Sequence, residues 1–249
     1  MTRSLLLLLG VFVAALPAPG NAAAPAPSPH CQVPPELVED DPRLPQLAQR
    51  LRDKQPVTIV AIGGASTAGR ATGNAAEASY PSRLQAVLRG RYPEASITVL
   101  NKGISRQTTQ EMVDRFPRDV FALGPALVIW ETGTVDAARG VDVDVFASAL
   151  ADGLAELREH KLEVMLVDMQ YSRGTASIIN FEPYLSTMWH MADLDDVYVF
   201  RRFEMMKYWS ETGVFSFVEV PKARRATLAA EVYGCIAERL ADAIEYATR

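Results

Sequence analysis

Five short apolar runs, separated by longer amphipathic segments, restrict the fold of this chain more than any other feature of its sequence. The runs contain apolar and β-branched residues without polar alternation, as strands covered on both faces do, and they span Val57–Ile62, Ser96–Leu100, Ala126–Trp130, Glu163–Val167 and Val197–Phe200. The other segments carry apolar residues at helical spacing, and they span Tyr80–Tyr92, Thr109–Phe121, Val143–His160, Pro183–Leu194, Phe203–Thr212 and Thr227–Ala247. Strand followed by helix, repeated along the chain, predicts a three-layer α/β/α sandwich around a five-stranded parallel sheet.

A sheet of this kind binds ligands beyond the carboxyl ends of its strands. The turns that follow Ile62, Leu100, Trp130 and Val167 are therefore the places where functional side chains are expected.

The N-terminal segment has the pattern of a secretory signal peptide. Arg3 precedes the apolar run Leu5–Leu16, and Ala22–Ala24 offers small residues for cleavage. We expect a signal peptide over 1–24, a Pro/Ala-rich extension over 25–50 and one domain over 51–249. The alternative for the first segment is an uncleaved anchor. Within the extension, Pro25–Pro35 has the composition of an extended tether.

Export places the two cysteines in a compartment where a disulfide persists. Cys31 lies near the start of the mature chain and Cys235 in its last helical segment. We expect a disulfide between them, which would link the extension covalently to that helix. The alternative is two buried, unpaired thiols.

The formal net charge of −5 argues against nucleic acid or an anionic membrane surface as the main partner. The pairs Arg201-Arg202 and Arg224-Arg225 have the character of solvated surface residues rather than of a basic cluster. Outside the N-terminal segment, the sequence predicts no stable membrane insertion.

A glycine-rich loop, AIGGASTAGRA at 61–71, follows the first predicted strand. A phosphate-binding loop would need lysine where Arg70 stands and a metal-binding hydroxyl where Ala71 stands, and the glycine spacing does not fit a dinucleotide loop either. A structural interpretation makes Ser66 the cap of the next helix. A third interpretation makes Ser66 a nucleophile.

Four blocks in order carry a family resemblance: AIGGASTAG at 61–69, VLNKGISRQT at 99–108, LVIWETGTVDA at 127–137 and VDMQYS at 167–172. Together they resemble the SGNH, or GDSL, hydrolases, over nearly the whole mature chain. The resemblance implies a flavodoxin-like sheet and serine ester hydrolysis without a cofactor. It assigns the nucleophile to Ser66 and an oxyanion-binding backbone N–H to Gly103.

Three positions depart from the family's pattern. The family has Gly-x-Asn-Asp in its third block, and Val135 stands here in place of the asparagine that donates to the oxyanion. The family has Asp-x-x-His before its last helix, and Arg224 and Thr227 occupy those two positions. Losing one oxyanion donor typically costs about 100- to 1000-fold in rate.

Another group would have to act as the base if the serine were active. His190 is a candidate, whereas His160 has the features of a solvated residue at a helix end and His30 lies in the extension. Carboxylates near the predicted crevice are further candidates, because burial can raise a carboxyl pKa towards neutrality, and these are Glu131, Asp136, Asp168 and Glu219. No His or Cys pair has the spacing of metal ligands.

The sequence therefore favours an exported SGNH-like protein with impaired catalysis whose crevice binds a small ester, acyl or glycan-derived ligand. One rival is an active serine esterase or acyl hydrolase that uses Ser66 with an unconventional base. Another is a structural or partner-binding envelope protein in which Arg224-Arg225 binds an anionic group.

Overall fold

The computed structural model of the protein describes residues 29–38, 43–218 and 220–249. The predicted signal peptide lies outside the described residues. Five parallel strands form one sheet in the order β2-β1-β3-β4-β5. They are β1 (Val57–Gly63), β2 (Ile97–Gly103), β3 (Leu127–Glu131), β4 (Glu163–Val167) and β5 (Tyr198–Phe200). The predicted parallel sheet is confirmed, and its order is the flavodoxin-like one, which reverses direction between β1 and β3.

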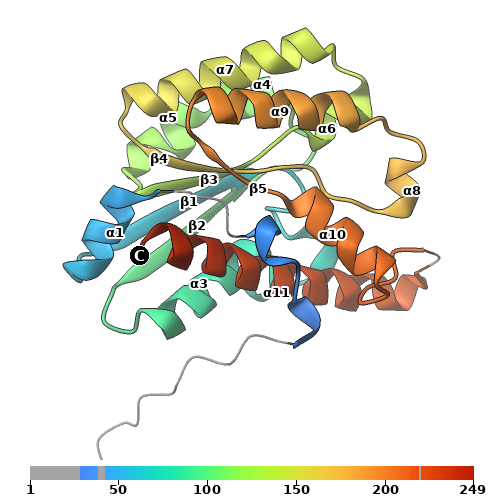
Figure 1. Cartoon of the computed structure of the whole chain (residues 1–249), viewed down its shortest axis with the longest axis horizontal. Coiled ribbons are helices and arrows are strands. Elements are labelled where there is room, and N and C mark those ends of the chain that lie inside the picture. Colours follow the sequence, from blue (N-terminus) through green and yellow to red (C-terminus); the bar gives the residue numbers. More distant parts are fainter. Residues whose placement is uncertain (1–28, 39–42, 219) are drawn as a thin grey trace, which may run out of the picture.

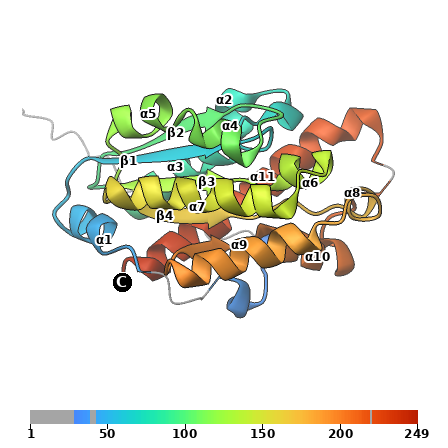
Figure 2. The same ribbon diagram turned by 90° about the horizontal axis from the view of Figure 1, so that it is seen from above.

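Helices cover both faces of the sheet, which confirms the three-layer architecture (Figure 1). One face carries α1 (Pro45–Arg52), α3 (Tyr80–Arg91), α10 (Arg202–Glu211) and α11 (Lys222–Ala247). The other carries α4 (Thr109–Val113), α5 (Phe116–Asp119), α6 (Thr134–Arg139), α7 (Val143–Glu159) and α9 (Glu182–Leu194). Figure 2 looks onto this second layer, with α7 and α9 nearest the viewer. The short helices α2 (Ala75–Ala78) and α8 (Arg173–Ala176) lie in connecting segments.

Two apolar cores, one on each side of the sheet, explain why the strands lack polar alternation. Ile59 and Ala61 point into the core beneath α3 and α11, while Val60 and Ile62 point into the core beneath α4 and α7. Each of these four side chains is at most 1% exposed. Both faces of β1 are thus buried, as its sequence predicted.

Prolines account for two differences between predicted and observed helices. The helix predicted over Thr109–Phe121 is divided, because α4 ends at Val113 and α5 begins anew with Pro117 in its first turn. A proline suits the first turn of a helix and disrupts its interior. The last helix begins after Pro221, five residues before the predicted start at Thr227.

The described part of the N-terminal extension packs against the domain instead of forming a tether. Cys31 is joined to Cys235 of α11 with Cα atoms 5.0 Å apart, so the predicted disulfide is confirmed. The Trp209 indole N–H donates to the Gln32 carbonyl over 3.0 Å. Leu47 of α1 is fully buried. None of the helices within the described ranges is long and apolar enough to cross a bilayer.

Candidate active site

The loop after β1 is fastened to the end of β3, at the point where the strand order reverses. The Gly64 amide and the Thr67 hydroxyl both donate to Glu131 Oε2 over 2.9 Å. A Cβ on Gly63 would lie 2.2 Å from Thr67 Oγ1 and 2.8 Å from Glu131 Cβ, so only glycine allows this approach. The glycines of the loop thus bring Ser66 next to the carboxylate that ends β3.

Arg202 fills the space between these two elements. It follows β5, and its side chain is 2% exposed. Nη1 donates to Ser66 Oγ over 2.9 Å, while Nη2 donates to Glu131 Oε1 over 3.1 Å and to the Asp168 carbonyl over 2.6 Å. Ser66 itself is only 4% exposed. The serine oxygen is therefore a buried acceptor for a guanidinium group, which is always protonated and cannot act as a base.

The prediction that Arg201-Arg202 is a solvated surface pair is wrong for Arg202. Arg202 was not identified from the sequence as a residue of the site. The signal that was available is its position, directly after the last buried strand at the crevice edge of the sheet. A cation at that edge lies within reach of the carboxylates that end the neighbouring strands.

Glu131 is a charged partner of Arg202 rather than a raised-pKa base. Burial acts to raise the pKa of Glu131, but Arg202, the Gly64 amide and the Ser66 hydroxyl outweigh it and hold the pKa below its ordinary value. The phenols nearby stay neutral, because burial raises the pKa of Tyr80, and burial together with the charge of Glu131 raises that of Tyr233 to about 12. One buried ion pair thus defines the electrostatics of the site.

The other candidate carboxylates hold helix starts. Asp168 is fully buried and accepts from the Phe203 amide over 2.8 Å and from the Trp189 indole over 3.3 Å. Burial raises its pKa to about 7. Asp136 accepts from the amide and the hydroxyl of Thr109 over 3.1 and 3.0 Å, and burial raises its pKa. Both aspartates thus hold the first turn of a helix through its backbone amides. The fourth candidate, Glu219, lies outside the described residues.

Among the described residues, none of the three histidines is a hydrogen-bond partner of Ser66. His190 is exposed on α9. His160 stacks on Phe121 with ring centroids 3.7 Å apart, and its Nδ1 lies 2.9 Å from the Glu156 carbonyl oxygen. His30 is exposed beside Phe215, with ring centroids 6.3 Å apart. Within the part of the chain that the structure describes, no imidazole is thus hydrogen-bonded to Ser66.

Of the two predicted oxyanion positions, Gly103 ends β2 and Val135 lies in α6, which follows β3. The Gly103 amide donates to Asn101 Oδ1 over 2.9 Å. A Cβ on Gly103 would lie 2.1 Å from the Ala68 nitrogen, so the glycine is needed where β2 ends against the Ser66 loop. Val135 is half-buried in the first turn of α6, and the neighbouring Thr134 hydroxyl is buried without a hydrogen-bond partner.

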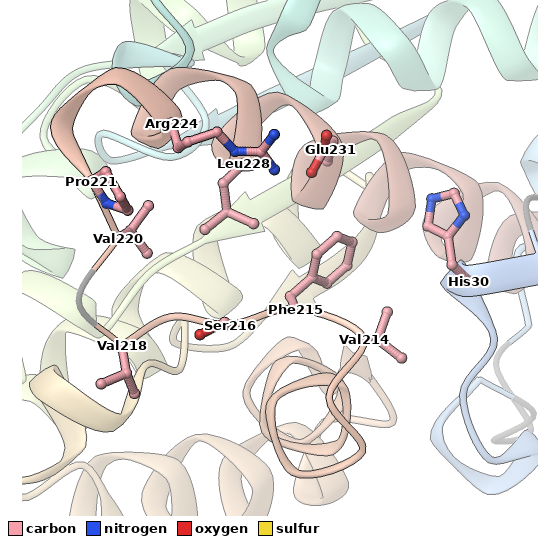
Figure 3. Close-up of a pocket in the computed structure, with 10 residues that line it drawn as sticks. All are labelled: His30, Val214, Phe215, Ser216, Val218, Val220, Pro221, Arg224, Leu228 and Glu231. Carbon is pink, nitrogen blue, oxygen red and sulfur yellow. The ribbon is translucent and has the colours of Figure 1, made fainter.

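Arg224 and Thr227 lie exposed in the first turns of α11, and within the described residues neither is hydrogen-bonded to Arg202 or Glu131. Arg224 lines a cavity of about 360 Å³ next to the N-terminal extension. Figure 3 shows Arg224, Leu228 and Glu231 along α11 on one side of this cavity and Phe215 on the loop opposite. The structure thus brings together Ser66, Glu131 and Arg202, and it leaves the positions of the family's acid–base pair on a separate surface.

A second cavity, of about 220 Å³, has Tyr233 in its wall, and the pKa of this phenol is raised mainly by burial. We call it the Tyr233 cavity, and it is lined by Ala71, Gln170, Tyr171, Ser172, Thr175, Met206, Phe217, Val220, Arg225, Leu228, Ala229, Val232 and Tyr233. Its lining comes from the loop after β4, from α10 and from α11, which is the crevice edge of the sheet.

A model of the non-GDSL lipase-like family matches residues 30–249, which is most of the chain and includes every residue of this site. The chain belongs to this family. The match to this non-GDSL lipase-like family also agrees with the SGNH/GDSL resemblance of the sequence blocks. No curated protein matches the chain.

Solved structures of esterases share the fold of this non-GDSL lipase-like chain. A protein from Desulfitobacterium hafniense assigned to the G-D-S-L lipolytic family has a TM-score of 0.56 and 21% identity, over 75% of this chain and 99% of its own. A catalytic mutant of Axe2, an acetylxylan esterase from Geobacillus stearothermophilus, has a TM-score of 0.60 and 18% identity, over 74% of this chain and 92% of its own. A two-domain esterase active on acetylated mannans has a TM-score of 0.64 and 18% identity, over 84% of this chain and 55% of its own. At these identities the likeness shows the fold alone.

Proposed function

We propose that this protein is an exported member of its family that has lost serine esterase activity and that binds an ester, acyl or glycan-derived ligand at the crevice edge of the sheet. The observation that carries the proposal is the hydrogen bond from Arg202 Nη1 to Ser66 Oγ. It occupies the oxygen that would have to attack an ester.

The chemistry of a serine nucleophile requires a base that accepts the hydroxyl proton. Glu131 is the anion beside Ser66, and its lowered pKa makes it a weak base. Proton transfer from Ser66 to Glu131 would also replace the carboxylate that pairs with Arg202 by a neutral acid and a far more basic serine alkoxide, which is costly. Both effects oppose formation of the alkoxide.

Export is supported by the signal-like N-terminal sequence together with the disulfide between Cys31 and Cys235. Ligand binding is supported by the Tyr233 cavity, whose lining includes the loop after β4, at the edge where such sheets bind ligands. Two of the structural neighbours are esterases that act on acetylated xylan or mannan. Their substrates combine an acyl ester with a glycan, the two ligand chemistries of the proposal.

Hydrolysis of short p-nitrophenyl esters by the purified mature protein tests the loss of activity. We expect equal rates for the protein, for Ser66→Ala and for the control Ser177→Ala, which alters an exposed serine outside the site. We also expect no labelling of Ser66 by a fluorophosphonate probe, because that reaction needs an activated hydroxyl. An enzyme-like rate that Ser66→Ala abolishes and Ser177→Ala preserves would refute the proposal and favour the hydrolase with an unconventional base.

A further inference from the structure

The Tyr233 cavity has an apolar interior with a single charged residue. Its walls include the aromatic side chains of Tyr171, Phe217 and Tyr233, together with Met206. Among its lining residues only Arg225 carries a charge. At about 220 Å³ the cavity is smaller than the sites of drug-sized ligands, which occupy roughly 300–1,000 Å³. It is therefore suited to a small molecule with an apolar part.

The guanidinium of Arg225 is oriented by a backbone carbonyl and is paired with none of the acidic side chains that the structure describes. Its Nε donates to the Val220 carbonyl over 3.1 Å, which fixes one edge of the group. No ion pair joins Arg225 to an acidic side chain within the described residues, whereas Arg91 is paired with Asp242 and Glu245. The terminal nitrogens of Arg225 thus present the planar fork that binds a carboxylate through two parallel hydrogen bonds.

The sequence neighbours of the lining residues include more basic than acidic side chains: Arg70, Arg173, Lys207 and Arg224 against Glu219 and Glu231. Arg70 precedes the lining residue Ala71, and Arg173 follows the lining residue Ser172. Both arginines are exposed, and neither forms an ion pair within the described parts of the chain. The whole chain has a net charge of −5, so this local excess of cations runs against its overall charge. Such an arrangement attracts an anion to one place on the surface.

We propose that the Tyr233 cavity binds a carboxylate anion with an apolar chain of medium length. The chain lies among Tyr171, Met206 and Phe217, and the carboxylate pairs with the Arg225 guanidinium at the cavity edge. The inference rests on the proposed loss of esterase activity. A protein without that activity does not need an ester as its ligand, and the ligand proposed here is a free acid.

Calorimetric titration of the mature protein with octanoate, octanol and acetate separates the two parts of this recognition. Octanoate should bind about tenfold more tightly than octanol, because one charge-assisted pair at a partly exposed site is worth roughly that factor. The preference should decrease at high salt, which screens exposed charges. Acetate should bind far more weakly than octanoate, since it leaves the apolar walls in contact with water.

Two neighbouring substitutions provide a matched comparison. Arg225→Gln should lower the affinity for octanoate about tenfold and leave the affinity for octanol unchanged. Arg224→Gln removes the same charge one residue away, but its side chain lines the cavity shown in Figure 3. We expect less than about a twofold change for octanoate with Arg224→Gln, because Arg224 does not line the Tyr233 cavity and its exposed charge acts there only through screened electrostatics.

Equal binding of octanoate and octanol, equal effects of the two arginine substitutions, or no binding of octanoate would each overturn the inference. Titration of Ser66→Ala with the same ligands keeps this outcome distinct from that of the proposed function. Esterase activity that depends on Ser66 refutes the loss of activity, whereas the Arg225 comparison in Ser66→Ala still measures recognition of the carboxylate.

Discussion

Replacement of Arg202 with methionine removes the cation at the centre of the site while retaining most of its apolar length. Arg202 makes three hydrogen bonds, to Ser66 Oγ, Glu131 Oε1 and the Asp168 carbonyl. All are lost in Arg202→Met. Glu131 then remains as a buried carboxylate without its counter-ion.

The expected loss of stability is about 3–5 kcal/mol at neutral pH, the range for removal of one partner from a buried ion pair. The upper part of that range applies here, because the side chains of Arg202 and Glu131 are only 2% and 4% exposed and solvent screens them little. A folded domain is stable by about 5–15 kcal/mol, so the variant should remain folded but with a clearly lower unfolding midpoint.

The loss should depend on pH in a defined direction. Burial is the largest influence on Glu131 and raises its pKa, and Arg202 is the largest of the groups that lower it. Without Arg202, the folded-state pKa rises above the unfolded value of about 4.3. A raised folded-state pKa contributes stability at low pH that is lost as the pH rises, so the variant should be least stable, relative to the natural protein, in alkaline solution.

Urea unfolding followed by tryptophan fluorescence at about pH 5 and about pH 8 measures both quantities. Arg158→Met is the control, because the ion pair of Arg158 with Asp195 lies at the surface and is worth about 1 kcal/mol or less. Adding Glu131→Gln to Arg202→Met should restore part of the stability at pH 8 by removing the unpaired charge. A loss below about 1 kcal/mol, or a loss greater at pH 5 than at pH 8, would refute the argument.

Three further variants test the residues that support the site. Cys31→Ser with Cys235→Ser should cost up to about 5 kcal/mol in urea unfolding, because the bond closes a loop of 204 residues, and a loss under 1 kcal/mol would contradict this. The Asp168 carboxyl, with its pKa raised to about 7, binds a proton more tightly in the folded state, so its contribution to stability is lost as the pH rises from about 4 to about 7. Asp168→Asn should remove this pH dependence, and an unchanged slope of stability against pH would contradict the prediction. Gly103→Ala should destabilise the fold by about 1–3 kcal/mol, as its Cβ would meet the facing loop at 2.1 Å, whereas Gly174→Ala, with open space around it, should not.

The spacing of apolar residues predicted the layers of this fold, because a strand that is buried on both faces has a continuous run of apolar residues. The β4 strand was predicted over Glu163–Val167 and occurs there. The order of apolar and polar residues within one segment shows which of its faces are buried, and this order can be recognised without knowing which other segments pack against it. Helix boundaries were less accurate where a proline begins a helix, as Pro221 does at α11.

The sequence predicted only part of the site. The sequence placed Ser66 after β1, and the departures at Val135 and Thr227 indicated that the family's donor and base were missing. The sequence did not predict that Arg202 reaches the serine, because that contact joins residues 136 positions apart. A contact of this kind depends on the order of the strands, and the periodicity of a single segment contains no information about it.

Strand order also explains why an arginine is tolerated so deep in the protein. The reversal between β1 and β3 leaves a gap at the carboxyl edge of the sheet, and an active enzyme of this architecture needs that gap for its substrate. Here the buried Arg202 occupies it and satisfies Glu131, Ser66 and the Asp168 carbonyl at once. A residue that satisfies buried acceptors stabilises the fold most when no ligand competes for them. The proposed ligand would then bind outside this gap, against Tyr233 and Arg225, in the cavity with the apolar walls.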